Sequence, residues 1–367
     1  MSGGMLIAGG GTGGHLFPGL AVAQALRGLD PGLELAFVST GKALESRVLS
    51  EAGFDLEPIA AQALRGAGWL ARLKTLAGLP ASLMAARGIV ERRRPALVLA
   101  VGGYAAFALG LMARLMGVPL VVQEQNALPG LTNRLLGRLA RRVFVAFQEA
   151  IPHFPAGKAM FTGNPLRAEL LASAHQAGQE RPDPSSRFNV LVLGGSQGAQ
   201  ALNQAIIESL PMLNSRRDRL FFTHQTGEKE REAVAAAYGR HGFTADVQAF
   251  YQDMGRLYGL AHLVICRAGA GTLTELMACG RAAVCVPYPF AAGDHQTKNA
   301  LAFAQAGAGR HLPQRDLKAA TVAALIAEFM ERPQLLSAME ERSQALGRPR
   351  AAQDIAHDCL ALMKEGA

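Results

Sequence analysis

The sequence predicts an α/β protein with two nucleotide-binding-type domains that face a shared cleft. Its 367 residues are enough for two domains, each with its own core. Predicted strands and helices alternate along the chain, which is typical of parallel sheets covered on both faces. Twice, at residues 6–15 and 190–199, an apolar strand also runs into a glycine-rich turn and then a helix. Such turns expose backbone N–H groups that anionic ligands can approach.

The strands are predicted from short apolar runs and the helices from the segments between them. In the first half, strands are expected at 5–8, 34–38, 97–101, 119–122 and 142–146, and helices at 18–28, 105–116 and 130–140. In the second half, strands are expected at 189–193, 220–223, 246–249, 262–266 and 283–287, and helices at 199–210, 272–279 and 294–307. Ligands of such sheets bind beyond the carboxyl ends of the strands, where both glycine turns fall.

The domain boundary is expected near residues 163–167, before a polar stretch that runs from Ala174 to Arg187. This predicts an N-terminal domain of residues 1–165 and a C-terminal domain of residues 166–345. A last helix at 350–364 has no strand after it, so residues 346–367 can pack back on the N-terminal domain or cap the other one.

The composition is that of a soluble α/β protein, and the formal charge of +8 favours anionic partners without choosing among them. The four cysteines lack metal-ligand or disulfide spacing, which indicates reduced thiols. No signal peptide is recognisable. Residues 96–112 are uncharged for about the length of a bilayer span, but a glycine pair in the middle favours a strand, a turn and a helix.

The first glycine turn, Gly9 to Gly14, fits the dinucleotide pattern G-x-G-x-x-G. A nicotinamide-binding domain also needs an acidic residue at the end of its second strand. That strand ends in Ser39-Thr40-Gly41, which disfavours a dehydrogenase. His15 follows the turn at a helix N-terminus, where the helix dipole favours the neutral ring and suits a general base. A capping or polar-core histidine is an equal alternative.

The second domain contains a denser group of polar residues between Cys266 and Leu276. A helix is expected to start near Thr272, with Thr272 or Thr274 as its cap. Glu275, about one turn inside, can accept hydrogen bonds from a ribose diol beside N–H groups that bind a diphosphate. A first-turn acid that only complements the helix dipole is the alternative.

The polar run Asp294 to Asn299 begins another helix and can bind sugar hydroxyls, with an ordinary capped helix start as the alternative. The sequence contains no Asp-x-Asp pair and no cluster with metal-ligand spacing. We therefore expect no catalytic metal and no other cofactor. Charge on a leaving diphosphate would be met by backbone N–H groups and cations such as Arg167.

Residues 65–94 form a basic, amphipathic segment with Trp69 and a stripe of leucines among seven Arg and Lys residues. This pattern favours the headgroup region of an anionic membrane. A solvated helix whose apolar stripe packs in the core is the alternative.

With these residues in view, the chain resembles the MurG family of peptidoglycan glycosyltransferases over nearly its full length. The resemblance rests on the order and spacing of several segments: 10–15 with 17–19, 102–104, 124–126, 163–165, 194–199, 267–275 and 295–299. It implies two Rossmann-like domains in the glycosyltransferase B arrangement with an interdomain cleft. It also implies an inverting, metal-independent transfer of N-acetylglucosamine from its UDP donor to the 4-hydroxyl of undecaprenyl-diphosphate-linked N-acetylmuramoyl-pentapeptide.

The resemblance also assigns residues. His15, Asn126 and Glu124 are expected at the catalytic centre, with His15 as the base, and Tyr104 at the acceptor. Contacts to UDP-N-acetylglucosamine are expected from Thr12, Gly13, Gly14, Asn126, Arg167, Ser196, Tyr251, Arg267, Ala270, Gly271, Thr272, Glu275, His295 and Gln296. Among these, Glu275 would bind the ribose, the backbone around Tyr251 the uracil, and Gln296 the sugar.

The resemblance further implies a peripheral protein on the cytoplasmic face of the bacterial inner membrane. Its partners would be the anionic membrane surface and other cell-wall synthesis proteins, and not nucleic acid. Three alternatives remain at this point: another transferase or an epimerase that uses a UDP-sugar, a non-catalytic nucleotide-sugar-binding subunit, and a NAD-type oxidoreductase.

Overall fold

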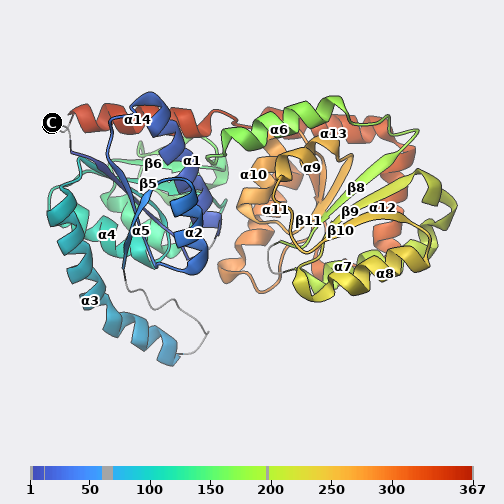
Figure 1. The fold of residues 1–367 in the computed structure, drawn as a ribbon, viewed down its shortest axis with the longest axis horizontal. Coiled ribbons are helices and arrows are strands. Elements are labelled where there is room, and N and C mark those ends of the chain that lie inside the picture. The colour runs from blue at the N-terminus through green and yellow to red at the C-terminus, as the bar shows by residue number, and fades with distance from the viewer. Residues whose placement is uncertain (1–2, 12, 60–68, 196–197, 366–367) are drawn as a thin grey trace. The chain divides into compact units, whose positions relative to one another are not determined.

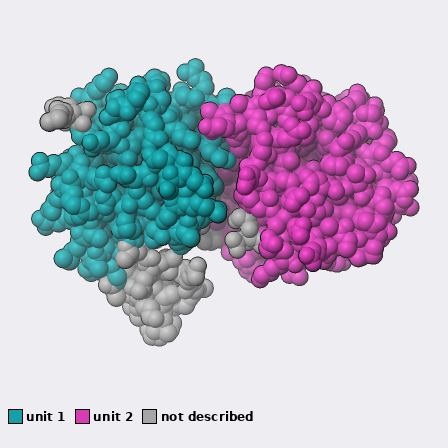
Figure 2. Space-filling view, viewed as in Figure 1, with its two compact units in different colours: residues 1–167, 349–367 teal, residues 168–348 magenta. Residues whose placement is uncertain are grey.

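The computed structural model describes residues 3–11, 13–59, 69–195 and 198–365, with the backbone alone at 69–77 and 292. The chain divides into two compact units, shown in Figure 2. Unit 1 comprises Met1–Arg167 and Pro349–Ala367, and unit 2 comprises Ala168–Arg348. These limits lie close to the expected domain boundaries.

Unit 1 contains a parallel sheet of seven strands, in the order β3-β2-β1-β4-β5-β6-β7. Figure 1 draws the strands of both units as arrows. Along the central strands, successive side chains enter opposite cores. Ile7 packs in one core, whereas Leu6 and Ala8 pack in the other. The strands are β1 (Met5–Gly9), β2 (Leu35–Ser39), β3 (Asp55–Pro58), β4 (Leu97–Gly102), β5 (Leu120–Glu124), β6 (Arg142–Val145) and β7 (Ala159–Phe161).

Helices cover both faces of this sheet. They are α1 (Gly13–Leu29), α2 (Ala43–Glu51), α3 (Trp69–Arg93), α4 (Tyr104–Leu115), α5 (Leu131–Leu139) and α14 (Ala351–Glu365). On one face α4 packs between α3 and α5. On the other, Ile355 and Cys359 of α14 share a core with Leu16 of α1. The last helix therefore packs back on the N-terminal unit.

Unit 2 contains a parallel sheet of six strands, in the order β10-β9-β8-β11-β12-β13. The strands are β8 (Phe188–Leu193), β9 (Leu220–Gln225), β10 (Thr244–Gln248), β11 (Leu263–Cys266), β12 (Ala283–Cys285) and β13 (Gly309–His311). Its helices are α6 (Ala168–Gln179), α7 (Gln200–Ser209), α8 (Arg231–Arg240), α9 (Met254–Leu260), α10 (Ala270–Ala278), α11 (His295–Gln305), α12 (Ala319–Glu331) and α13 (Pro333–Leu346). The two parallel sheets confirm the expected fold class.

The polar stretch that follows the expected boundary is helical in its first part, because Ala174 lies within α6, which belongs to unit 2. This helix packs closely on α9 through two glycines spaced four residues apart, Gly255 and Gly259. A Cβ on Gly259 would lie 2.6 Å from the carbonyl oxygen of Ala174, so a larger residue would force the helices apart.

The uncharged segment at 96–112 forms β4, the turn at Gly103 and α4, as expected. Within the described parts of the chain, no helix combines the length and the apolar character needed to cross a bilayer.

Candidate functional site

In each unit, two glycine-containing turns lie at the point where the strand order of the sheet reverses. In unit 1 this switch point falls between β1 and β4, which are followed by residues 10–14 and 102–103. In unit 2 it falls between β8 and β11, which are followed by residues 194–199 and 267–269. Doubly wound sheets bind ligands at this point. Each unit therefore has one candidate site.

His15 lies in the first turn of α1, against the turn that follows β4. Its Nδ1 lies 3.2 Å from the carbonyl oxygen of Gly10. Because a carbonyl oxygen only accepts, Nδ1 carries the proton of the neutral ring and Nε2 is the basic nitrogen. A Cβ on Gly102 would lie 2.8 Å from Cδ2 and 2.9 Å from Nε2 of this ring. Glycine at 102 thus leaves room for the imidazole at the switch point.

Glu45, at the start of α2, holds the first glycine turn. Its carboxylate is 2% exposed and accepts hydrogen bonds from the N–H of Gly11, from Ser39 Oγ at 2.8 Å and from the N–H of Lys42 at 3.0 Å. Burial alone would raise the pKa of Glu45, but these bonds and those from Thr40 bring it below its usual value. The N–H of Gly11 is therefore already bonded and is not available to an anionic ligand.

This carboxylate lies against the end of the second strand, which lacks an acid of its own. In a dinucleotide-binding domain the acid at that point binds the ribose. Here Glu45 is engaged by its own chain, which adds to the argument against a NAD-type oxidoreductase.

Glu124, at the end of β5, lies inside unit 1 with 1% of its surface exposed. Its oxygens accept from the N–H of Asn126 at 2.8 Å, from Asn133 Nδ2 at 2.9 Å and from the N–H of Gly130 at 3.2 Å. Burial raises the pKa of Glu124, while these N–H donors counteract that rise. Glu124 thus holds the half-buried Asn126 and its loop in place.

Arg167 and Tyr104 lie near the same end of the sheet in unit 1. The Arg167 guanidinium lies 5.3 Å from the ring centroid of Phe17, two residues beyond His15. Tyr104 is the first residue of α4, directly after the turn that contacts His15. Gly13 and Gly14 begin α1. The expected contacts Thr12 and Ser196 lie outside the described residues.

In unit 2, α10 begins at Ala270 with Gly269 as its N-cap, two residues before the expected start. Thr274 is not a cap, because its Oγ1 donates to the carbonyl oxygen of Ala270 at 2.8 Å. Thr272 lies in the first turn together with Gly271. Glu275 falls in the second turn, so the alternative of a first-turn acid that complements the dipole does not apply.

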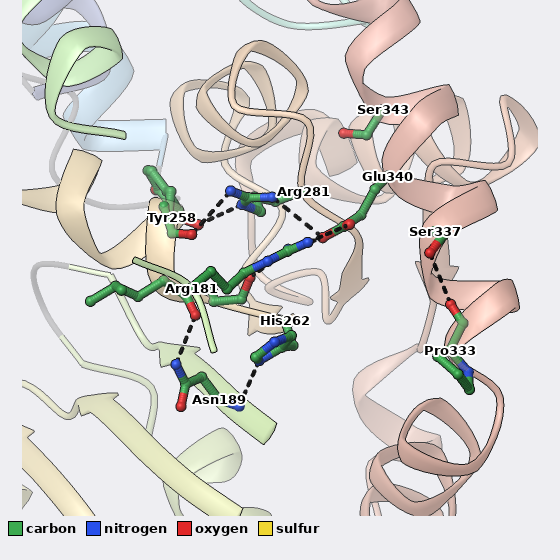
Figure 3. Close-up of polar contacts among 12 residues, drawn as sticks. Arg181, Asn189, Tyr258, His262, Arg281, Pro333, Ser337, Glu340 and Ser343 are labelled. Carbon is green, nitrogen blue, oxygen red and sulfur yellow. Dashed lines mark hydrogen bonds and ion pairs between the residues drawn. The ribbon is translucent and has the colours of Figure 1, made fainter. Parts of the chain in front are cut away.

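A buried tyrosine contacts the Glu275 carboxylate. The hydroxyl of Tyr258, a residue of α9 that is 1% exposed, donates to Glu275 Oε2 at 2.7 Å. Arg281 fixes the end of α9, because its Nε donates to the carbonyl oxygen of Tyr258 at 2.6 Å. Figure 3 shows Arg281 between Tyr258 and Glu340, whose carboxylate Arg181 also approaches, at 2.5 Å. Tyr258 was not recognisable as a site residue from the sequence.

The remaining expected donor contacts lie on neighbouring loops of unit 2. Arg267 donates to the carbonyl oxygens of Val286 and Pro287, at 3.2 Å each. The N–H of Tyr251 donates to a side-chain oxygen of Gln225 at 3.3 Å. These loops follow β11, β12 and β10, so they meet at one edge of the sheet.

The start of α11 contains a backbone feature that the sequence did not reveal. Asp294 has φ +56° in the left-handed region, which is unusual for a residue other than glycine and often marks functional sites. His295 and Gln296 follow directly, and Gln296 Oε1 accepts from the N–H of Tyr288 at 2.9 Å. The loop after β12 is thereby tied to the helix expected to contact the sugar.

The structure describes the basic segment 65–94 only in part. From residue 78 onward, Ala86, Ile89 and Val90 pack in the core, while Arg93 pairs with Glu57 at 2.8 Å. This half fits the alternative of a helix packed in the core. The side chain of Trp69 and those of the cations before residue 78 lie outside the description.

A second apolar and basic surface, which the sequence analysis missed, lies on α5. Leu131, Leu135 and Leu139 are 71%, 37% and 40% exposed. Their spacing of four residues places them on one side of the helix, with Arg134 and Arg138 between them. The 3.6-residue period was present in the sequence, but only the fold shows that this stripe faces outward.

Among the described residues, no three His, Cys, Asp or Glu side chains gather as ligands for a metal ion. All four cysteines are free, and three of them are buried.

The two domains of glycosyltransferase family 28 both match this chain, the N-terminal domain at residues 5–145 and the C-terminal domain at residues 189–355. A relative from Myxococcus xanthus is 43% identical over 98% of this chain and 93% of its own length. One from Geobacter sulfurreducens is 45% identical over 97% of this chain and 98% of its own length. Both are named UDP-N-acetylglucosamine–N-acetylmuramyl-(pentapeptide) pyrophosphoryl-undecaprenol N-acetylglucosamine transferase.

Solved structures agree. MurG of Acinetobacter baumannii superimposes with a TM-score of 0.78 at 32% identity, over 97% of this chain and 98% of that one. A UDP-GlcNAc 2-epimerase from Neisseria meningitidis superimposes with a TM-score of 0.68 over 97% of this chain and 99% of that one, but at 14% identity it is similar in fold alone. The chain therefore belongs to the MurG family within glycosyltransferase family 28.

Proposed function

We propose that this protein transfers N-acetylglucosamine from UDP-N-acetylglucosamine to the 4-hydroxyl of undecaprenyl-diphosphate-linked N-acetylmuramoyl-pentapeptide, a step of peptidoglycan synthesis. The observation that carries the proposal is the similarity to transferases of that name across both units, at 43–45% identity. A glycine-lined switch point in each unit supports it, because the reaction needs a donor site and an acceptor site.

The donor is proposed to bind unit 2. Glu275 would accept from the ribose hydroxyls, and the N–H groups at the start of α10 would bind the diphosphate. Arg267 and Tyr251 would lie at the uracil, and His295 and Gln296 at the sugar. The fixed carboxylate of Glu275 beside a glycine-capped helix start supports this assignment.

The acceptor is proposed to bind unit 1, with His15 as the base. Nε2 would take the proton of the acceptor's 4-hydroxyl. The oxygen of that hydroxyl would bond to the anomeric carbon as the bond from this carbon to UDP breaks, with inversion. Backbone N–H groups and Arg167, rather than a metal, would stabilise the leaving diphosphate. The contact of Nδ1 with the carbonyl oxygen of Gly10 supports Nε2 as the basic nitrogen.

We further propose that unit 1 binds the cytoplasmic face of the inner membrane peripherally, where the lipid-linked acceptor is embedded. The exposed leucines of α5 would enter the headgroup region, and the arginines between them would meet anionic lipids. Cell-wall synthesis proteins remain proposed partners on the strength of the family alone.

The test is release of UDP from UDP-N-acetylglucosamine with and without a lipid-linked N-acetylmuramoyl-pentapeptide analogue. We expect release that depends on the acceptor and forms a β-linked disaccharide. His15→Ala should lower turnover about 10²- to 10⁴-fold, the usual contribution of a general base, with a much smaller effect on UDP affinity. Epimerisation of the donor without acceptor would overturn the proposal.

A further inference from the structure

The Gly10–Gly11 peptide lies between His15 and Glu45 and is hydrogen-bonded to both. The carbonyl oxygen of this peptide belongs to Gly10 and accepts from His15 Nδ1 at 3.2 Å. Its N–H belongs to Gly11 and donates to Glu45 Oε1. One planar amide thus has the imidazole on one side and the carboxylate on the other.

The carboxylate end of this chain is firmly fixed. Ser39, Thr40 and the N–H of Lys42 all donate to Glu45, whose side chain is buried. The Lys42 ammonium also donates to the carbonyl oxygen of Gly11, at 2.8 Å. Both the N–H and the carbonyl oxygen of Gly11 are therefore bonded, and these bonds determine the orientation of the Gly10–Gly11 peptide.

Hydrogen bonds in such a chain strengthen one another. A carboxylate that accepts from an amide N–H increases the negative charge on the carbonyl oxygen of the same amide. That oxygen then becomes a better acceptor for Nδ1–H and favours the imidazolium that forms when Nε2 takes a proton. A carboxylate that contacts a histidine directly has the same effect in hydrolases.

We propose that Glu45 is a positioning residue that acts on His15 through the Gly10–Gly11 peptide, fixing the ring with Nδ1 protonated and making Nε2 a stronger base. This inference rests on the proposed role of His15 as the base. No proton passes along the chain: the proton from the acceptor hydroxyl stays on Nε2, Nδ1 keeps its own, and Glu45 stays ionised.

Three other charged groups lie around this turn. Lys42 contacts Gly11, Arg167 lies over Phe17, and Glu124 lies behind Asn133. Asn133 Nδ2 would lie 3.6 Å from a Cβ on Gly102. Glu45→Gln removes none of these three charges, so its effect on His15 can be separated from theirs.

The test compares Glu45→Gln with Glu57→Gln in the full-length protein. Glu57 is also in unit 1 and is partly buried, but it pairs with Arg92 and Arg93 and not with the glycine turn. We expect Glu45→Gln to lower turnover about 10- to 100-fold, the loss seen when a group that orients a metal-ligating histidine is removed. The acidic limb of the pH–rate profile should move to lower pH, because a weaker base loses its proton more readily. UDP affinity should stay at the parental value, and Glu57→Gln should change neither rate nor profile.

A measurement on the parent protein guards against a variant that does not fold. In ¹⁵N-histidine NMR spectra, neutral His15 should carry its proton on Nδ1. In the uniformly ¹⁵N-labelled protein, protonation of Glu45 should shift the Gly11 amide resonance. A neutral ring protonated on Nε2 would overturn the inference. So would a folded Glu45→Gln variant with the rate and pH profile of Glu57→Gln. If His15→Ala keeps full turnover, the proposed base itself is wrong, whatever the result at Glu45.

Discussion

Replacement of Tyr258 by Phe tests the donor site with the loss of a single atom. Tyr258 is 1% exposed, and its hydroxyl lies 2.7 Å from Glu275 Oε2. Burial and the nearby carboxylate raise its pKa well above the usual value, so the phenol stays protonated and donates. The variant keeps the ring and its packing but removes this hydrogen bond to the Glu275 carboxylate. Less of the orientation of Glu275 is then set before the nucleotide binds.

The size of the effect follows from this contact. A hydrogen bond to a charged group contributes about 1.5–3 kcal/mol. The bond already exists without nucleotide, so most of this loss falls on folding stability. The part that orients Glu275 falls on binding, where we expect about three- to tenfold weaker UDP affinity, or about 0.7–1.4 kcal/mol. The donor KM should rise by a similar factor while kcat at saturation is unchanged.

Calorimetry with UDP and 2′-deoxy-UDP isolates the ribose contact. The ratio of the two affinities should be largest in the parent protein, smaller in Tyr258→Phe and near one in Glu275→Ala. Tyr238→Phe is the matched control, because Tyr238 is equally buried and bonds to His224 at 3.1 Å instead. If Tyr238→Phe changes the binding of uracil, it changes the affinity for both nucleotides by the same factor, and the ratio of the two affinities stays the same. A parental ratio in folded Tyr258→Phe would refute the argument for Tyr258. A parental ratio in Glu275→Ala would refute the ribose assignment.

Three further outcomes are expected. Gly102→Ala should lower turnover about 10- to 100-fold, because His15 must recede by about 0.6 Å to restore an ordinary contact, and such shifts are costly in catalysis. Gly117→Ala is the control, because Gly117 also has a positive φ but no atom lies within 4 Å of a new Cβ there. Enzyme assays of this variant should show parental turnover. A similar loss in both variants would contradict the steric argument. Replacement of both Leu131 and Leu135 by Ser should weaken sedimentation with anionic vesicles but not UDP binding, and unchanged sedimentation would remove α5 from the membrane proposal. The pKa of Glu45 is lower in the folded than in the unfolded protein, so its ionised carboxylate stabilises the fold at neutral pH. This stabilisation is lost as the pH falls through the folded-state pKa. In urea denaturation below about pH 4.5, the free energy of unfolding should therefore fall more steeply in the parent than in Glu45→Gln. Equal slopes would contradict the lowered pKa.

The sequence predicted the inner strands better than the edges of the sheets. All ten expected strands are present. Nine of them are inner strands, and strands buried on both faces read as continuous apolar runs. The tenth, β10, lies at an edge. The three strands that were missed, β3, β7 and β13, all lie at a sheet edge. Their sequences, Asp-Leu-Glu-Pro, Ala-Met-Phe and Gly-Arg-His, are short and partly exposed, so they carry no such run.

The site was predictable where its geometry is local. Glycine turns after apolar strands, and Glu275 just beyond one of them, follow from spacing along the chain. The start of α10 was misplaced because Ala270 and Gly271 read as part of a loop, although they are helical. Glu45 and Tyr258 could not be found in this way. Their partners Gly11 and Glu275 lie 34 and 17 residues away, and only the fold brings them together.

Glu45 and Glu340 are two carboxylates held in different ways, Glu45 by neutral hydrogen-bond donors and Glu340 by cations. Neutral donors suit a carboxylate at the switch point better. Glu340 is paired with Arg181 and Arg281, an arrangement that cancels its charge while it fixes the end of α9. Glu45 is held instead by backbone N–H groups and hydroxyls, which fix its position but leave its charge in place. That charge opposes the positive end of the α1 dipole, which on its own would make an imidazole at 15 a weaker base. The arrangement around Glu45 therefore holds the ring still without lowering its basicity, a combination that an Arg partner for Glu45 would not supply.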